Sequence, residues 1–518
     1  MLKHYVVIGA FVAANLAGCL PSHPIRSMNS STTVHDKPLD SAAVDQQVND
    51  AMRLFVDGNW PQALPALQHI VDDGSFMRLP SDIRYRVLKA ASEAAQYHGG
   101  SPEVAHKNLM RLVSMPQANF EDWQHRAQAA GRLNDIVDCV SSLTVMVSRW
   151  PERFAWSKSA ISLNDGIRYI IDAASKKRVS VFPLLLALYD AHWRFHWDVE
   201  PSDAWRDLTL LLLENGHLAR ALDVAQHVTS AYTLIAMRAD RRFDAVVAAD
   251  PGHFDVETAA KRELQRFQDA ADGDPESLEA KVDVIQSMIN MQSYGAALAA
   301  SDSIFLDIKS TNYPEHRYKD FGDYIASFME ARAATLERVE RWEEARTELS
   351  AAAKTAGIYG TTGAILNLAS LDCALERPND ALLVIDRLLP GATDALGKMY
   401  VEVDRLDASL QLGDSRQASR SLEYLRLHRA DSPWEFLLAL ILMNQPDQAA
   451  HELISQLRDE RERQQALLVV QYYPQSPETK RDAQIDAQLR ALMIRPDVRR
   501  EINKVGRIER YSLEDPLF

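Results

Sequence analysis

The sequence predicts an all-α protein, an α-solenoid of stacked antiparallel helical hairpins with degenerate repeats. Three observations lead to this prediction. From residue 42 onward, long amphipathic segments carry apolar residues three and four positions apart, and short breaks with Gly, Pro, Asn or Asp separate them. Alternating patterns typical of strands are nearly absent. One pattern of large and small residues also recurs along the chain, which is typical of repeat architectures.

Residues 1–18 have the features of a secretory signal peptide. A positive charge precedes an apolar run from Tyr5 to Leu16, and this run is shorter than the roughly 20 apolar residues of a membrane-spanning helix. The run ends in Leu16-Ala17-Gly18-Cys19. This ending resembles the lipobox of bacterial lipoproteins, and the resemblance implies a lipidated Cys19. An ordinary signal peptide, or an uncleaved anchor with an incidental cysteine, is the alternative.

Residues 19–41 are predicted to be the lipidated cysteine and a flexible tether. The segment is rich in Pro, Ser, Thr and His, and a coil of about 20 residues has a typical reach of about 25 Å. Residue 20 is Leu rather than Asp, and an Asp there resembles an inner-membrane retention signal. The resemblance therefore implies a bacterial envelope protein anchored in the outer membrane and facing the periplasm.

Residues 42–200 are predicted to form an N-terminal region of helical hairpins that ends in an irregular junction. Trp60 and Ala63 start a pattern of a turn residue, two variable residues and an alanine, and weaker copies start at Pro102 and Leu133. Between residues 151 and 201 the repeat rhythm is lost. Low-quality repeats are the alternative interpretation of this junction.

Residues 201–475 carry the clearest repeats. In the best unit, Ala333 lies on the first helix, Trp342 at the turn and Ala345 on the second helix. A small residue on each helix allows close approach, and a large residue at the turn fills the end of the groove. The pattern resembles a tetratricopeptide repeat. The residues expected to form the packing framework are Trp60, Ala63, Tyr294, Ala297, Trp342, Ala345, Ala381 and Ala418.

The spacing of these repeats is irregular. The alanines at 297, 345, 381, 418 and 449 are 48, 36, 37 and 31 residues apart, whereas the tetratricopeptide period is 34 residues. Residues 476–518 follow as a predicted capping helix and a loose tail, because terminal residues are often poorly ordered. A tail that docks on another protein is the alternative.

One cluster is a candidate recognition site. His192, Trp193, His196 and Trp197 lie in an aromatic segment, and on a helix the two histidines would share one face. Two histidines without a third ligand are weak evidence for a metal, so we expect the tryptophans to pack the junction. A groove that binds sugar or peptide is the alternative. Cys139 and Cys373 lie in apolar helical patterns and are expected to be buried single thiols, with a disulfide as the alternative.

The sequence contains no recognisable catalytic motif, and no cofactor is expected. Its formal net charge of −15 disfavours nucleic acid as a partner. We therefore expect a membrane-anchored periplasmic scaffold that binds an envelope protein or peptide partner through a concave surface. An accessory protein or an unrecognised enzyme in envelope polysaccharide or peptidoglycan handling is the alternative.

Overall fold

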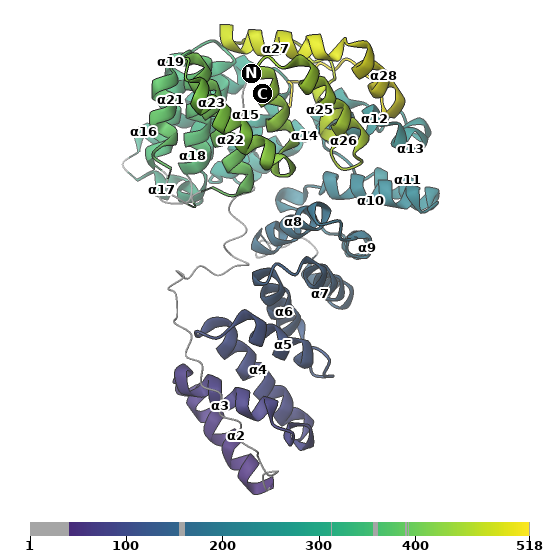
Figure 1. Ribbon diagram of the computed structural model, residues 1–518, viewed down its shortest axis with the longest axis vertical. Coiled ribbons are helices and arrows are strands. Elements are labelled where there is room, and N and C mark those ends of the chain that lie inside the picture. Colours follow the sequence, from purple (N-terminus) through teal and green to yellow (C-terminus); the bar gives the residue numbers. More distant parts are fainter. Residues whose placement is uncertain are drawn as a thin grey trace. The chain divides into compact units, whose positions relative to one another are not determined.

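The computed structural model describes residues 41–154, 161–311, 313–355, 361–388, 391 and 393–516 (Figure 1). Within these ranges the regular structure is α-helix and short 3₁₀-helix, with isolated β-bridges such as Asp240 to Gly506 and Tyr472 to Arg510, so the all-α prediction is confirmed. No helix in the described ranges is long and apolar enough to cross a membrane. Cys19 and its tether lie outside these ranges. The chain divides between Val199 and Glu200 into two compact units, here called the N-terminal unit and the C-terminal unit.

The N-terminal unit consists of successive helical hairpins. Helix α2 packs on α3, α4 on α5 and α6 on α7, while α3 also contacts α4 and α5 contacts α6. Each hairpin is therefore stacked on the next. The helices are α2 (Ser41–Val56), α3 (Trp60–Asp72), α4 (Ser81–Tyr97), α5 (Pro102–Leu112), α6 (Phe120–Arg132), α7 (Ile136–Arg149), α8 (Ile161–Lys176) and α9 (Phe182–Asp190).

The C-terminal unit repeats the same arrangement over a longer stretch. Its first half contains α10 (Ser202–Glu214), α11 (Leu218–Ala225), α12 (Ala231–Ala239), α13 (Asp244–Ala249), α14 (Val256–Gly273), α15 (Leu278–Asn290), α16 (Tyr294–Ser310), α17 (Pro314–Arg317), α18 (Phe321–Glu337) and α19 (Trp342–Thr355). Its second half contains α20 (Thr361–Ala374), α21 (Pro378–Ile385), α22 (Ala395–Gln411), α23 (Ser415–Leu427), α24 (Pro433–Leu442), α25 (Pro446–Arg458), α26 (Arg463–Val469), α27 (Lys480–Met493) and α28 (Pro496–Val505).

Consecutive hairpins of this unit stack through their first helices. Helix α15 contacts α18, α20 contacts α22, and α22 contacts α24. Each of these first helices also packs on the second helix of its own hairpin, as α18 does on α19 and α22 on α23. The architecture is therefore the predicted tetratricopeptide-like stack of antiparallel hairpins.

One turn conformation recurs between the two helices of a hairpin. In eight of the described hairpins a residue with positive φ stands two positions before the second helix begins. Glycine adopts this left-handed conformation at no steric cost, whereas other residues do so only where the surrounding structure requires it. The residues at this position are Gly58, Asn134, Gly216, Gln292, Glu340, Glu376, Gly413 and Asn444.

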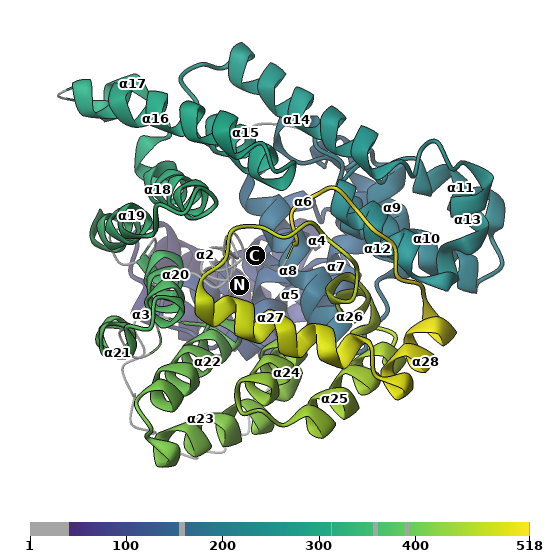
Figure 2. The same cartoon turned by 90° about the horizontal axis from the view of Figure 1, so that it is seen from above.

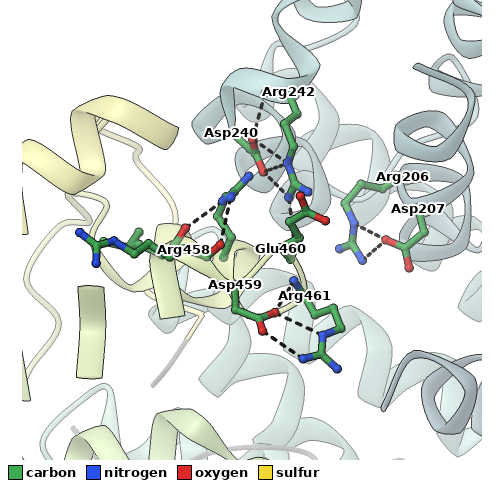
Figure 3. Close-up of polar contacts among 10 residues, drawn as sticks. Arg206, Asp207, Asp240, Arg242, Arg458, Asp459, Glu460 and Arg461 are labelled. Carbon is green, nitrogen blue, oxygen red and sulfur yellow. Dashed lines mark hydrogen bonds and ion pairs between the residues drawn. The ribbon is translucent and has the colours of Figure 1, made fainter. Parts of the chain in front are cut away.

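The C-terminal unit closes on itself through contacts between segments near its start and segments near its end. Helix α12 contacts α26, and an antiparallel bridge joins Asp240 to Gly506. In Figure 2 the helices from α12 to α26 form an arc, and α27 and the chain end lie on its inner side. At the closure, Arg242 Nη2 donates to the Asp240 carboxylate at 2.6 Å and to the Glu460 carbonyl at 3.3 Å (Figure 3).

Candidate functional site

The segment around His192 does not have the helical geometry that the sequence suggests. Helix α9 ends at Asp190, and His192 and Trp197 have positive φ angles of 55° and 59°. The expectation that His192 and His196 share one helix face is therefore wrong. His192 is exposed, and the His196 side chain lies outside the described structure.

Trp193 is a buried packing residue of the N-terminal unit. It has no exposed surface, and its indole Nε1 donates to Asn164 Oδ1 at 2.7 Å. Its ring meets Phe195 edge to face, with centroids 5.1 Å apart. A side chain enclosed in this way cannot contact a ligand in this conformation. Trp197, four residues further along the chain, is partly buried.

The described residues also limit metal and disulfide chemistry. They contain no group of three or more His, Cys, Asp or Glu side chains arranged for a metal ion. Cys139 and Cys373 are both buried, and each Sγ lies 3.5 Å from a backbone carbonyl oxygen. Burial raises the pKa of the Cys139 thiol to about 12, so the thiol stays protonated and unreactive at neutral pH.

The framework residues divide into two groups. The alanines at positions 63, 297, 345, 381 and 418 are buried. The aromatic residues Trp60, Tyr294 and Trp342 begin α3, α16 and α19, and each is only partly buried. Trp60 stacks on His98 in the N-terminal unit, whereas Tyr294 and Trp342 lie at the site described next.

A cavity opens on the inner side of the C-terminal unit. Its walls come from α18, α19, α20, α26, α27, the segment 471–478 and Asp515, and its empty space of about 910 Å³ includes open solvent at the mouth. Aromatic side chains on this wall are Trp342, Tyr472 and Tyr473. Its ionisable side chains are Glu337, Arg338, Glu478, Asp482, Asp486, Arg490 and Asp515.

The chain end runs beside this cavity as an extended segment. We call residues 507–516 the tail. Tyr472 N donates to Glu509 O at 3.0 Å, and Tyr511 N donates to Tyr472 O at 2.9 Å, which gives a short parallel bridge. The Gln471 amide adds two contacts, because its Nε2 donates to Arg507 O at 3.1 Å and its Oε1 accepts from Glu509 N at 2.8 Å.

At the end of the tail, the Glu514 carboxylate is enclosed by donors from other elements. Arg338 Nε donates to it at 2.6 Å, and Ser476 Oγ lies 2.8 Å from each oxygen. The Tyr294 hydroxyl also donates to it. We call Arg338, Ser476 and Tyr294 the carboxylate cradle. Glu514 is 2% exposed.

The ionisation of the cradle follows from this arrangement. Burial alone would lower the pKa of Arg338, but the nearby Glu514 raises it overall, so the guanidinium stays charged. Burial and then the hydrogen bond to Glu514 raise the pKa of Tyr294, so its hydroxyl keeps its proton and donates. The result is a charge-assisted network of the kind that binds a carboxylate strongly.

The tail backbone is fixed as well. Glu514 N donates to Asn290 O at 2.8 Å, at the end of α15, and the Tyr232 hydroxyl of α12 donates to Glu514 O at 3.0 Å. The expected loose tail is therefore not what the structure shows. Sequence reasoning singled out Tyr294 and Trp342 as packing residues and missed Arg338, Ser476 and Glu514, because no motif marks a contact between residues so far apart in the chain.

A second group of titratable side chains lies on α14, α15 and α18. Burial, and then the charges of Glu279 and Glu263, raise the pKa of Asp283 to about 8. Burial raises the pKa of Glu330 on α18 to about 7. Tyr324 hydrogen-bonds Glu279. Both carboxyl groups therefore keep their protons to a higher pH than free carboxyl groups do.

No protein-family model matches the sequence, and no curated protein matches it. Solved structures with similar helical arrangement include a Rap protein complexed with competence and sporulation factor, at 12% identity over 90% of this chain and 99% of that chain, with a TM-score of 0.28. The P58(IPK) TPR domain matches at 13% identity over 80% of this chain and 100% of that chain, with a TM-score of 0.21.

The APC/C hetero-tetramer Cut9-Hcn1 matches at 11% identity over 90% of this chain and 96% of that chain, with a TM-score of 0.28. Likenesses at this level carry no conclusion about partners. What this chain binds has to be argued from its own cavity and cradle.

Proposed function

We propose that the protein is a scaffold that binds protein or peptide partners through the inner face of its C-terminal unit. The observation that carries this proposal is the cavity on that face, whose walls bring aromatic and arginine side chains together. Aromatic and arginine side chains are the types that dominate binding energy at protein interfaces. The cavity walls combine Trp342, Tyr472 and Tyr473 with Arg338 and Arg490.

The stacked architecture is consistent with this use. The first helices of successive hairpins pack side by side, so they share a continuous surface on one side of the unit. The inner face is also polar at defined points, because Arg338 and Ser476 already hold a carboxylate there. Polar groups at fixed positions in a binding site give specificity.

We further propose that the protein is attached to the bacterial outer membrane through a lipidated Cys19 and faces the periplasm. The support is the sequence Leu16-Ala17-Gly18-Cys19 and its likeness to a lipobox. Lipid chains on a cysteine give stable anchoring when more than one is present. Cys19→Ser is therefore expected to move the full-length protein from the membrane fraction to the soluble fraction. Unchanged sedimentation with membranes would contradict the anchor.

Partner binding is tested by crosslinking in cells, followed by purification of the full-length protein. We compare Tyr472→Ala, which removes an aromatic side chain from the cavity wall, with Tyr313→Ala, which removes an exposed aromatic side chain of the segment before α17. The expected result is a reproducible protein partner whose yield falls at least about fivefold in the first variant only, as for a loss of about 1 kcal/mol at a hot spot. Recovery of no reproducible protein partner would contradict the scaffold proposal.

A further inference from the structure

We propose that the carboxylate cradle is a recognition site for an extended acidic segment of a partner protein, and that the tail occupies it until that segment replaces it. The inference rests on the proposed scaffold function and names the chemistry of its ligand. The contacts that the tail makes with the cradle are then the contacts that the partner segment makes when it replaces the tail.

The cradle requires an anion. Arg338 is 7% exposed, and its guanidinium is paired with Glu514. If the tail left without replacement, a buried charge would lose its partner, and removing one member of a buried ion pair is strongly unfavourable. A segment that displaces the tail must therefore bring a carboxylate to the same place. A neutral segment would leave Arg338 without the ion-pair partner that Glu514 provides.

The tail also defines which neighbouring residues the segment needs. Tyr511, Leu513 and Glu514 are buried, whereas Ser512 between them is exposed. The matching pattern is an aromatic residue, one variable residue, an aliphatic residue and an acidic residue. The backbone bridge to Tyr472 is independent of side-chain identity, as it is when an extended peptide adds to a strand edge.

The cavity explains how a partner can compete with the tail. Asp515 lies on the cavity wall directly after Glu514, so residues that follow the acidic residue of a partner segment can contact the cavity. A tethered tail has an effective concentration of roughly millimolar, and the additional contacts in the cavity are what a partner can use against it. A short free peptide lacks these contacts and should compete poorly with the intact tail.

The test uses a fluorescent peptide with the sequence of residues 507–516 and full-length protein variants, with binding measured by anisotropy. Glu514→Gln removes the charge that the cradle holds. Glu315→Gln is the control, because Glu315 is an exposed acid of α17. We expect the first variant to bind the peptide at least tenfold more tightly than the parent, and the control to bind it as the parent does. A peptide with Gln in place of its own Glu514 should bind at least tenfold more weakly.

Amide hydrogen exchange of residues 507–516 shows whether Glu514→Gln releases the tail. Faster exchange without tighter peptide binding would overturn the proposal, and so would exchange that is unchanged from the parent. Tyr511→Ala, which keeps the Arg338–Glu514 pair, is a second way to loosen the tail if Glu514→Gln does not fold. Equal binding of the Glu and Gln peptides would also overturn it.

The two proposals can fail separately. A partner recovered by crosslinking, together with a peptide that does not bind either loosened variant, would refute the cradle as a recognition site and leave the scaffold function standing. A peptide that binds as expected, without any partner in cells, would refute the scaffold function. If both are correct, Glu514→Gln should raise the yield of the crosslinked partner.

Discussion

At the scale of single residues, alanines at the helix crossings set how closely the two helices of a hairpin approach. Ala297 on α16 has no exposed surface, whereas the adjacent Ala296 is exposed. Ala297→Leu should lower the free energy of unfolding by about 1–3 kcal/mol, because extra methylenes in a packed interface force side chains and backbone to move. Ala296→Leu should change it by less than about 0.5 kcal/mol. Urea denaturation followed by circular dichroism checks both, and equal effects would contradict this register of packing.

The same scale shows what spacing can and cannot predict. Close packing of two helices demands a small residue at a fixed distance after the turn, so the alanine positions are visible in the sequence. The turn itself is not, because Gln292, Glu340 and Glu376 adopt positive φ there without any glycine to signal it. His192 was misplaced for the same reason, since a left-handed turn follows α9 where the periodic pattern suggests more helix.

At the scale of helices, the neighbouring carboxyl groups of α14 and α15 should make the stability of the C-terminal unit depend on pH. Asp283 on α15 is the group with the clearest effect. The pKa of Asp283 is raised from 3.8 to about 8 in the folded protein. Below pH 4 the group is protonated in both the folded and the unfolded state. Between about pH 4 and 8 the unfolded chain loses the proton and the folded protein keeps it, so stability falls as the pH rises through this window.

Asp283→Asn removes that titration. The variant should unfold like the parent near pH 4, and it should be more stable than the parent near pH 8, by on the order of 1 kcal/mol because Asp283 is partly exposed. Asp269→Asn is the control, because this aspartate is exposed on α14. Glu330 retains part of the pH dependence in every variant. An Asp283→Asn protein that loses stability with pH as steeply as the parent would contradict the assignment.

The tail shows why the carboxylate cradle could not be predicted from the pattern of helices in the sequence. Helix α28, which precedes the tail, is visible in the sequence as a periodic pattern, and a capping helix is a reasonable expectation. The contacts of Glu514 with Arg338 and Tyr294 span 176 and 220 residues. Only the curvature of the stacked hairpins brings these residues together, and curvature results from many small rotations that no local pattern encodes.

At the scale of the whole molecule, the C-terminal unit is held closed by its own chain end. Arg507 N donates to Ala239 O at 2.9 Å, and the Arg238 guanidinium pairs with Glu509 at 2.8 Å. Ala239 also shares a buried apolar cluster with Leu467 and Ile502. Contacts of this kind join the first and last repeats, so the unit is expected to behave as a closed structure rather than as an open array in which each repeat contacts only its neighbours.

Gly506→Ala tests this closure with the smallest possible change. A Cβ at position 506 would lie 2.4 Å from Ala239 O and 2.6 Å from the Leu467 side chain. The backbone at residue 239 or at residue 506 must therefore move. We expect a loss of stability of about 1–3 kcal/mol and faster amide exchange at residues 238–244 as well as at 506–511. Gly322→Ala on α18 is the control, because a Cβ there meets nothing within 4 Å. If exchange increased only around residue 506, the closure would not couple the two ends of the unit, because residues 238–244 would then be held in place without the chain end.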